Sequence, residues 1–217
     1  MFLTMLVVCT NGTEPFSGRN SKFGIKMLSV QSLNDALHQE GLAKLNSNAL
    51  LLYIGKTAGR NNWFIDTGFT AYWVRGKEDQ STSSFSCFGI PFGYGYKIWE
   101  NNSMCVYSYL NLSWMPTRLQ IDDKTSANSF SSAFASPATT RAFFNQEIDS
   151  ALGLSIHLGK KKREWVEISG RYNFRLWQSK WNYSGNTIKD FPRVDCRGWE
   201  IGIAWGVLDK KCNKKAE

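Results

Sequence analysis

Residues 199–207 have the sequence WEIGIAWGV, in which large apolar residues alternate with small or acidic ones. An alternation with a period of two is typical of a β-strand whose two faces meet different surroundings. The same alternation recurs in further segments, at 22–31, 49–57, 63–73, 84–99, 103–115, 148–158 and 166–176. The chain is therefore predicted to be an all-β protein with eight strands.

The composition agrees with an all-β chain and excludes one class of membrane protein. Of the 217 residues, 14% are aromatic, nine are Trp and 18 are Gly, a combination that favours strands over helices. The mean hydropathy is -0.34, and no stretch approaches the roughly 18 consecutive apolar residues of a membrane-spanning helix. The length fits a single barrel or sandwich domain.

Three regions differ in composition. Residues 1–21 begin with an apolar segment, Phe2 to Cys9, that matches either a truncated secretory signal peptide or a buried first segment. Residues 22–208 carry the strand pattern and form the predicted barrel, and residues 209–217 are a basic tail. Much of the net charge of +8 lies in this tail and in the turn at 159–163. A nucleic-acid partner, which needs a basic face with aromatic residues, is not expected.

The cysteines and histidines do not have the spacing of a metal site. The five cysteines, Cys9, Cys87, Cys105, Cys196 and Cys212, include no CxxC pair. Cys87 and Cys105 fall in neighbouring predicted strands, where they form either a disulfide or, in better agreement with the odd count, buried free thiols. His38 and His157 have no ligand-type neighbours, and we expect neither a metal site nor a cofactor.

The connections between the predicted strands alternate in length. Three are short, at 58–62, 100–102 and 159–162, and four are long and polar, at 32–48, 76–83, 116–146 and 182–195. In an up-and-down meander, successive connections emerge at opposite ends of the strands. Short turns at one end and long loops at the other are typical of outer-membrane barrels. The predicted fold is an eight-stranded antiparallel up-and-down transmembrane β-barrel.

The polar faces of the strands favour this membrane barrel over a soluble one. A soluble barrel has its apolar face inside, and a membrane barrel has it outside. Glycines recur on the polar face, and small residues suit the narrow inside of an eight-stranded barrel. The charges there have both signs, which suits a paired network. We predict a polar network in the lumen made of Asp66, Lys97, Asp149, His157, Glu167, Arg171, Arg175 and Glu200.

Tryptophans mark the predicted edges of the membrane-facing surface. Trp63 and Trp73 lie on the same apolar face, ten residues apart, which is roughly 33 Å along a strand. A strand tilted by about 40° then spans about 25 Å of bilayer, the height of a lipid-facing band between aromatic girdles. Trp114 and Trp199 lie near the long-loop ends of their strands. We predict that these four residues form an aromatic girdle.

With its loop asymmetry and phrases such as FGIPFGYGY at 88–96 and ALGL at 151–154, the chain resembles small outer-membrane β-barrels of the OmpA/OmpX-like superfamily. More narrowly, it resembles uncharacterised barrels of Bacteroidetes, over residues 22–208. The resemblance implies the outer membrane of a Gram-negative bacterium, contact with outer-membrane lipid, and a role as a surface or structural protein, envelope partner or narrow pore. The chain departs from the family where its last strand ends near Val207 and Leu208, since these barrels often end on an aromatic residue.

A narrow lumen filled by side chains excludes large-solute porin activity. We therefore expect a plugged, non-enzymatic barrel that binds envelope or surface proteins through the loops 32–48 and 116–146. One alternative is a soluble, lipocalin-like barrel that binds a small apolar ligand. Another is a lipid-modifying hydrolase that uses Ser155, His157 and Glu167. Because Ser155 and His157 face the predicted interior, away from lipid, they fit better as members of the polar network.

Overall fold

The computed structural model describes residues 16–78, 81–101, 103–123, 140–158, 164–189, 191–192, 194 and 196–209. Residues 1–15 of the predicted leader and the tail from residue 210 lie outside this range, as do Cys9 and Cys212. The elements, in chain order, are β1 (Phe16–Met27), α1 (Gln31–Gln39), β2 (Asn48–Arg60), β3 (Trp63–Lys77), β4 (Ser81–Glu100), β5 (Met104–Asp123), β6 (Thr140–Leu158), β7 (Glu164–Gln178), β8 (Asn182–Tyr183), β9 (Asn186–Thr187) and β10 (Gly198–Leu208).

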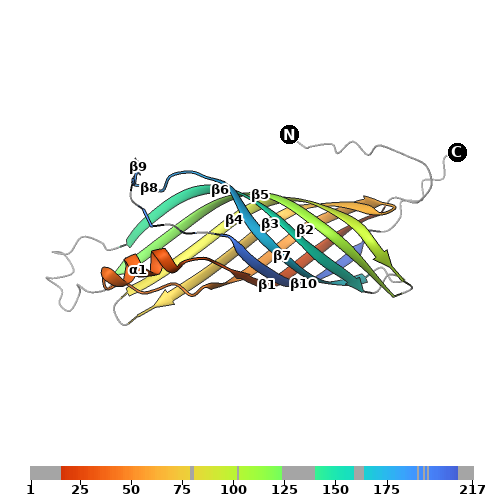
Figure 1. The fold of residues 1–217 in the computed structure, drawn as a ribbon, viewed down its shortest axis with the longest axis horizontal. Coiled ribbons are helices and arrows are strands. Elements are labelled where there is room, and N and C mark those ends of the chain that lie inside the picture. Colours follow the sequence, from red (N-terminus) through yellow and green to blue (C-terminus); the bar gives the residue numbers. More distant parts are fainter. Residues whose placement is uncertain are drawn as a thin grey trace.

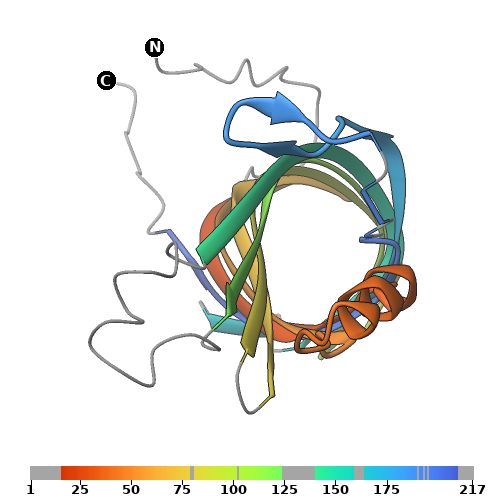
Figure 2. The same ribbon diagram turned by 90° about the vertical axis from the view of Figure 1, so that its left-hand side faces the viewer.

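Eight of these strands form a closed antiparallel barrel. Strands β1 to β7 pair in chain order, and β10 pairs with both β7 and β1, so that the ring has no free edge. The remaining two strands, β8 and β9, form a small hairpin attached to the end of β6. Figures 1 and 2 show the barrel from the side and along its length. The predicted eight-stranded up-and-down fold is confirmed.

The apolar rows of the strands face outward. Phe69 on β3 is 72% exposed and Trp205 on β10 is 62% exposed, and the inward residues Asp66 and Ala204 on the same strands are buried. A soluble barrel with its apolar rows around an internal cavity would have the opposite arrangement. The lipocalin-like alternative is therefore wrong. Within the described residues, no helix is long and apolar enough to cross a membrane.

The two ends of the barrel differ as the sequence predicts. At one end β2 and β3 are joined by Asn61 and Asn62 alone, and Asn61 has a φ of +57°, the left-handed conformation that a tight turn requires. The described chain also begins and ends there (Figure 1). At the other end lie α1 and the β8–β9 hairpin. We call these the short-turn end and the loop end.

The strands at the loop end are longer than predicted. Strand β5 continues to Asp123 and β6 begins at Thr140, so both ends of the predicted loop 116–146 belong to a β-ladder, in which Asp122 pairs with Thr140. Residues 124–139 of this loop lie outside the described part. Likewise β1 begins at Phe16 rather than at residue 22, inside the predicted leader. The loop 32–48 contains most of the helix α1.

Prolines interrupt the ladders locally, as their missing N–H groups require. Pro91 lies in β4, and the β3–β4 register runs from Thr67↔Phe92 to Thr70↔Gly89 without the two pairs between them. The ladder is therefore broken locally at Pro91. The register shift in β4 lies elsewhere, between Lys97 and Trp99.

An apolar cluster of buried residues lies at the loop end of the barrel, and it was not predicted from the sequence. Helix α1 contributes Leu33 and Leu37, four residues apart on one face, and Asn34 fastens the helix by two hydrogen bonds to the backbone of Leu45. We call the cluster the loop-end core; it contains Leu28, Val30, Leu33, Leu37, Leu45, Ala49, Leu51, Tyr72, Val74, Phe85, Cys87, Met115, Leu119, Ile121, Trp181, Val194 and Cys196.

Candidate functional site

The inward side chains of the barrel below the loop-end core are the candidate site, because they decide what can pass through or bind inside. Asp66 on β3 is the centre of one group. Its carboxylate accepts hydrogen bonds from the hydroxyls of Tyr53 (2.6 Å) and Tyr109 (3.1 Å), and from Thr57 and Asn20. These partners come from β1, β2 and β5, so Asp66 links strands on different sides of the lumen.

The lumen also contains ion pairs that join one strand to another. Arg171 Nε lies 2.6 Å from Glu200 Oε1, and the two residues are directly opposite in the β7–β10 ladder. Lys22 Nζ on β1 lies 3.2 Å from Glu167 Oε1 on β7.

The register explains the second of these pairs. Lys22 and Glu167 both pair with Ala204 from opposite sides, so they meet across a small residue. Buried charges of this kind persist only where a partner compensates for their lost hydration.

Glycines make room for the aromatic rings of this region. A Cβ atom at Gly93 would lie 2.0 Å from the Tyr109 hydroxyl, and one at Gly206 would lie 2.0 Å from the Trp165 ring. These two glycines of the polar face therefore lie inside the barrel, as predicted, each under a large side chain. Arg171 lies over the Tyr109 ring at 5.0 Å, so rings and charges share the same space.

Of the predicted network, Lys97 lies apart from the rest, and Arg175 lies at its loop-end edge, opposite Asp149 in the β6–β7 ladder. Lys97 is near the short-turn end of β4 and pairs with Glu100. Arg175 donates to the Val194 carbonyl at 3.0 Å, beside the loop-end core. The six others, Asp66, Asp149, His157, Glu167, Arg171 and Glu200, all make the lumen contacts described here. Their joint action as a network stays a prediction.

Several charged partners of these residues were not predicted from the sequence. Lys22 and Lys26 share one face of β1, and both are buried in ion pairs, to Glu167 and Asp149. Their four-residue spacing around Gly24 was a usable signal. Glu147 is fully buried, but it follows directly on the predicted loop 116–146 and gave no such signal.

Ser155, His157 and Glu167 come together, but not as a catalytic triad. His157 Nε2 lies 3.4 Å from Ser155 Oγ and 3.3 Å from Glu167 Oε2, so a single ring nitrogen faces both partners. A triad needs the nucleophile on one nitrogen and the carboxylate on the other. The imidazole is also stacked on the Trp165 ring at 4.6 Å, inside the barrel. This geometry speaks against a hydrolase.

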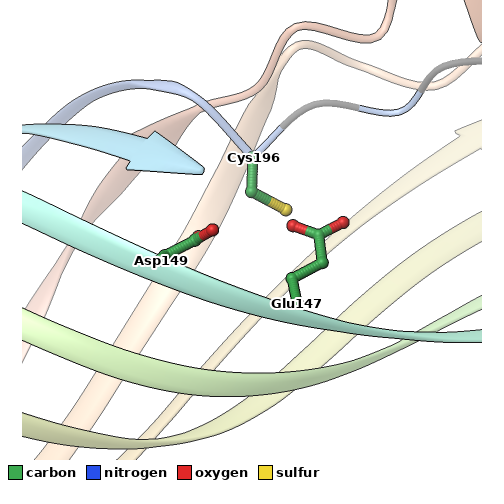
Figure 3. A group of neighbouring side chains, drawn as sticks. All are labelled: Glu147, Asp149 and Cys196. Atoms are coloured by element: carbon green, nitrogen blue, oxygen red, sulfur yellow. The ribbon is translucent and has the colours of Figure 1, made fainter. Parts of the chain in front are cut away.

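A different group of side chains lies at the boundary with the loop-end core. Glu147 and Asp149 on β6 and Cys196, just before β10, place their ligand-type atoms within 4.8 Å of one another, and all three are buried (Figure 3). We call this group the acid–thiol cluster. Cys87, Cys105 and Cys196 are free thiols, as expected. Burial raises the pKa of the Cys196 thiol well above its ordinary value.

The four predicted girdle tryptophans all lie on the outer surface. Trp63, Trp73, Trp114 and Trp199 are 37% to 55% exposed. Trp63 follows the Asn61–Asn62 turn and Trp73 lies ten residues nearer the loop end. Their placement fits two edges of a lipid-facing band, and their role as a girdle stays a prediction.

Comparison with known proteins supports the fold. No protein-family model matches the chain, and no curated protein matches it. A major outer membrane protein of Thermus thermophilus superposes with a TM-score of 0.52 and 8% identity, over 89% of this chain and 99% of that one. Ail, the attachment invasion locus protein of Yersinia pestis, in complex with the heparin analogue sucrose octasulfate, gives 0.50 and 12%, over 91% and 100%. At such identities the likeness concerns the fold alone.

The closed ring and the outward apolar rows define the class of protein. A closed barrel satisfies every backbone hydrogen bond within the bilayer, and its apolar outer surface needs lipid around it. The chain is an eight-stranded transmembrane β-barrel of the Gram-negative outer-membrane type. The fold class and location predicted from the sequence are confirmed. The narrower resemblance to Bacteroidetes barrels stays a prediction.

Proposed function

We propose that the chain is a non-conducting outer-membrane barrel that acts as a structural or surface interaction protein through its loop end. The observation that supports this proposal is the set of buried, paired side chains that point into the lumen. A cavity of about 20 Å³, lined by residues including Asn111, Arg171 and Glu200, lies among the ion pairs. That volume has room for about one water molecule. The loop-end core fills the next part of the barrel.

The loops have divided roles in this proposal. Loop 32–48 places its apolar side chains in the loop-end core, so the surface that it offers to a partner is the polar side of α1, with Asp35, His38 and Gln39 exposed. The β8–β9 hairpin is exposed at the same end, on another side of the barrel mouth (Figure 2). Residues 124–139 remain the proposed contact segment of the loop 116–146. A partner of this end would therefore bind a polar surface.

The proposal includes no enzymatic activity. The shared use of His157 Nε2 by Ser155 and Glu167 supports a structural role for this group. The change Ser155→Ala should leave the mass of lipid A unaltered when the protein is overexpressed. A lipid A mass shift that depends on Ser155 would contradict the proposal and restore the hydrolase alternative.

Planar-bilayer recording tests the closed lumen. The wild-type barrel, confirmed as folded by its heat-modifiable band on a gel, should give no stable nanosiemens-scale channel. A double variant, Arg171→Ala with Glu200→Ala, removes two large side chains that line the cavity, and should show more frequent small openings. A steady large conductance of the wild type would contradict the proposal.

Labelling of intact cells tests which end is outside. The variant His38→Cys places a thiol on the exposed side of α1, and Asn62→Cys places one in the β2–β3 turn. A membrane-impermeant maleimide should label the first variant and leave the second unlabelled until the cells are opened. The reverse pattern would place the loop end in the periplasm and remove the basis of a surface role.

A further inference from the structure

The acid–thiol cluster contains atoms that can bind a metal ion. A metal site there would be a property additional to the proposed function. Glu147 and Asp149 are two apart on β6, so both side chains point inward. Cys196 enters from the connection that precedes β10. In Figure 3 the carboxylate groups of Glu147 and Asp149 and the sulfur of Cys196 converge on one point.

The cluster also contains a buried carboxylate oxygen that could bind a metal ion and that accepts no hydrogen bond from a nitrogen or hydroxyl group. Glu147 is 0% exposed, and within the described residues no nitrogen or hydroxyl group donates a hydrogen bond to its Oε2 atom; the thiol of Cys196 is the remaining hydrogen-bonding neighbour of this carboxylate. A buried carboxylate oxygen in this state is costly unless a proton or a cation compensates for it. The other oxygen, Oε1, accepts a hydrogen bond of 2.9 Å from Gln178 Nε2, which fixes the direction of the free one.

The surroundings hold the thiol in position. The Val194 carbonyl, two residues before Cys196, accepts a hydrogen bond of 3.0 Å from Arg175 Nη1 and lies 3.5 Å from Gln178 Nε2. Gln178 therefore contacts both the carboxylate and the segment that carries the thiol. Outer contacts of this kind orient the ligands of metal sites.

We propose that Glu147, Asp149 and Cys196 bind a divalent transition-metal ion of the Zn²⁺ type, with a fourth position open to water. Thiolate and carboxylate ligands suit Zn²⁺, whereas Ca²⁺ and Mg²⁺ prefer six or more oxygen ligands. Zinc–ligand distances of about 2.0–2.3 Å in a tetrahedral site place donor atoms roughly 3.3–3.5 Å apart. The present separations of up to 4.8 Å need only small side-chain rotations to reach this value.

The charges of the region also fit a divalent ion. The two carboxylates and a thiolate carry three negative charges. Lys26 Nζ lies 3.6 Å from Asp149 Oδ2 and supplies one positive charge, and Arg175, opposite Asp149 in the β6–β7 ladder, supplies a second. The cluster then keeps a net negative charge, which favours the binding of a cation. On binding, the Cys196 S–H bond breaks, its electron pair forms the sulfur–metal bond, and the proton passes to solvent.

The test uses the full-length barrel, refolded in detergent after reduction and treatment with a chelator. Cys9 and Cys212 are first replaced by Ser, so that these two thiols do not bind metal. The protein should retain one equivalent of Zn²⁺ after gel filtration. With Co²⁺ it should show the near-ultraviolet charge-transfer absorption of a thiolate–cobalt bond.

Variants locate the site. Cys196→Ser should abolish the charge-transfer absorption, and Glu147→Gln should weaken Zn²⁺ binding by more than the roughly 10–100-fold typical of an outer contact. Gln178→Ala should weaken Zn²⁺ binding by a factor within that range. Cys105→Ser is the matched control, because Cys105 is also a buried free thiol but lies on β5 opposite His157, and it should change nothing.

Two results would overturn the site. One is the absence of stoichiometric metal in the folded barrel. The other is a charge-transfer absorption that survives Cys196→Ser or is lost equally in Cys105→Ser. Because a variant of the cluster can fail to fold, X-ray absorption at the zinc edge of the parent protein gives an independent result. One sulfur with oxygen neighbours supports the site, and a shell without sulfur contradicts it.

Discussion

The two halves of the barrel are built on opposite patterns. Towards the short-turn end the outer face is apolar and the inner face carries ion pairs and hydrogen-bonded rings, as in a membrane barrel. Towards the loop end the alternation inverts: on β5 Arg118 is exposed on the outside, and Leu119 and Ile121 are buried inside. That is the pattern of a soluble barrel. The same strands therefore pass through two environments, the lipid bilayer and water.

The length of the strands explains why both patterns occur in one chain. Strands β4 and β5 have 20 residues each and β6 has 19, whereas about 9–11 tilted residues cross a bilayer. The strands are long enough to continue beyond the lipid, where the outer face meets water and the inner face can be apolar. The difference teaches that the surroundings of a strand segment, rather than the strand, set its polarity. The following variants probe the two halves separately.

The largest effect is expected in the polar half, from Arg171→Leu. The change leaves Glu200 buried without its 2.6 Å partner, and breaking a buried ion pair costs about 3–5 kcal/mol. The free energy of unfolding in lipid vesicles, measured with urea, should fall by that amount. The double variant Arg171→Leu with Glu200→Leu should lose much less. A double variant that loses as much stability as the single variant, or more, would show that the unpaired buried Glu200 is not the source of the loss.

A smaller effect is expected in the loop-end core, from Leu119→Ala. Leu119 is fully buried, and removal of a buried leucine side chain costs about 2–4 kcal/mol. Hydrogen exchange should accelerate mainly in α1 and the loop-end parts of β4 and β5. Arg118→Ala, on the opposite face of the same strand, is the control and should shift stability by less than about 0.5 kcal/mol. Uniform acceleration along the whole barrel would show that the two halves unfold as one unit.

The smallest effect is expected from a single methyl group at a glycine. Gly93→Ala places a Cβ atom 2.0 Å from the Tyr109 hydroxyl and so disturbs its hydrogen bond to Asp66, at a cost of about 1–3 kcal/mol. At Gly170 an added Cβ meets no atom, and Gly170→Ala should change stability by less than about 0.5 kcal/mol. The same urea measurement checks both variants, and equal effects would show that the rings do not depend on the glycines.

The sequence was sufficient to predict the barrel because period-two patterning is strong where lipid lies on one side and a polar lumen on the other. The loop predicted for residues 116–123 and 140–146 is wrong, because these residues form strands. There the outer face is polar, and the pattern no longer continues the apolar row of Leu110, Leu112 and Trp114. Inversion of the alternation, rather than its loss, was the signal that marked these residues as strand.

The candidate sites divide in the same way. Asp149, Glu167, Arg171 and Glu200 were predictable because they alternate with apolar residues on recognisable strands. The acid–thiol cluster was not, because Cys196 lies 47 positions after Asp149 and reaches it only through the path of the connection before β10. Metal-ligand spacing in the sequence cannot detect ligands that are brought together by barrel closure.

The pairing of β1 with β10 closes the barrel, and this closure affects the order in which contacts form during folding. The loop-end core joins Leu33 and Leu37, from near the beginning of the chain, to Val194 and Cys196, from near its end. Contacts of such long sequence separation form late, because most of the chain entropy must be lost first. A barrel that has not closed therefore leaves these leucines uncovered. Uncovered apolar surface is what chaperones and proteases act on, so we expect a barrel without this core to be more accessible to both than a closed one.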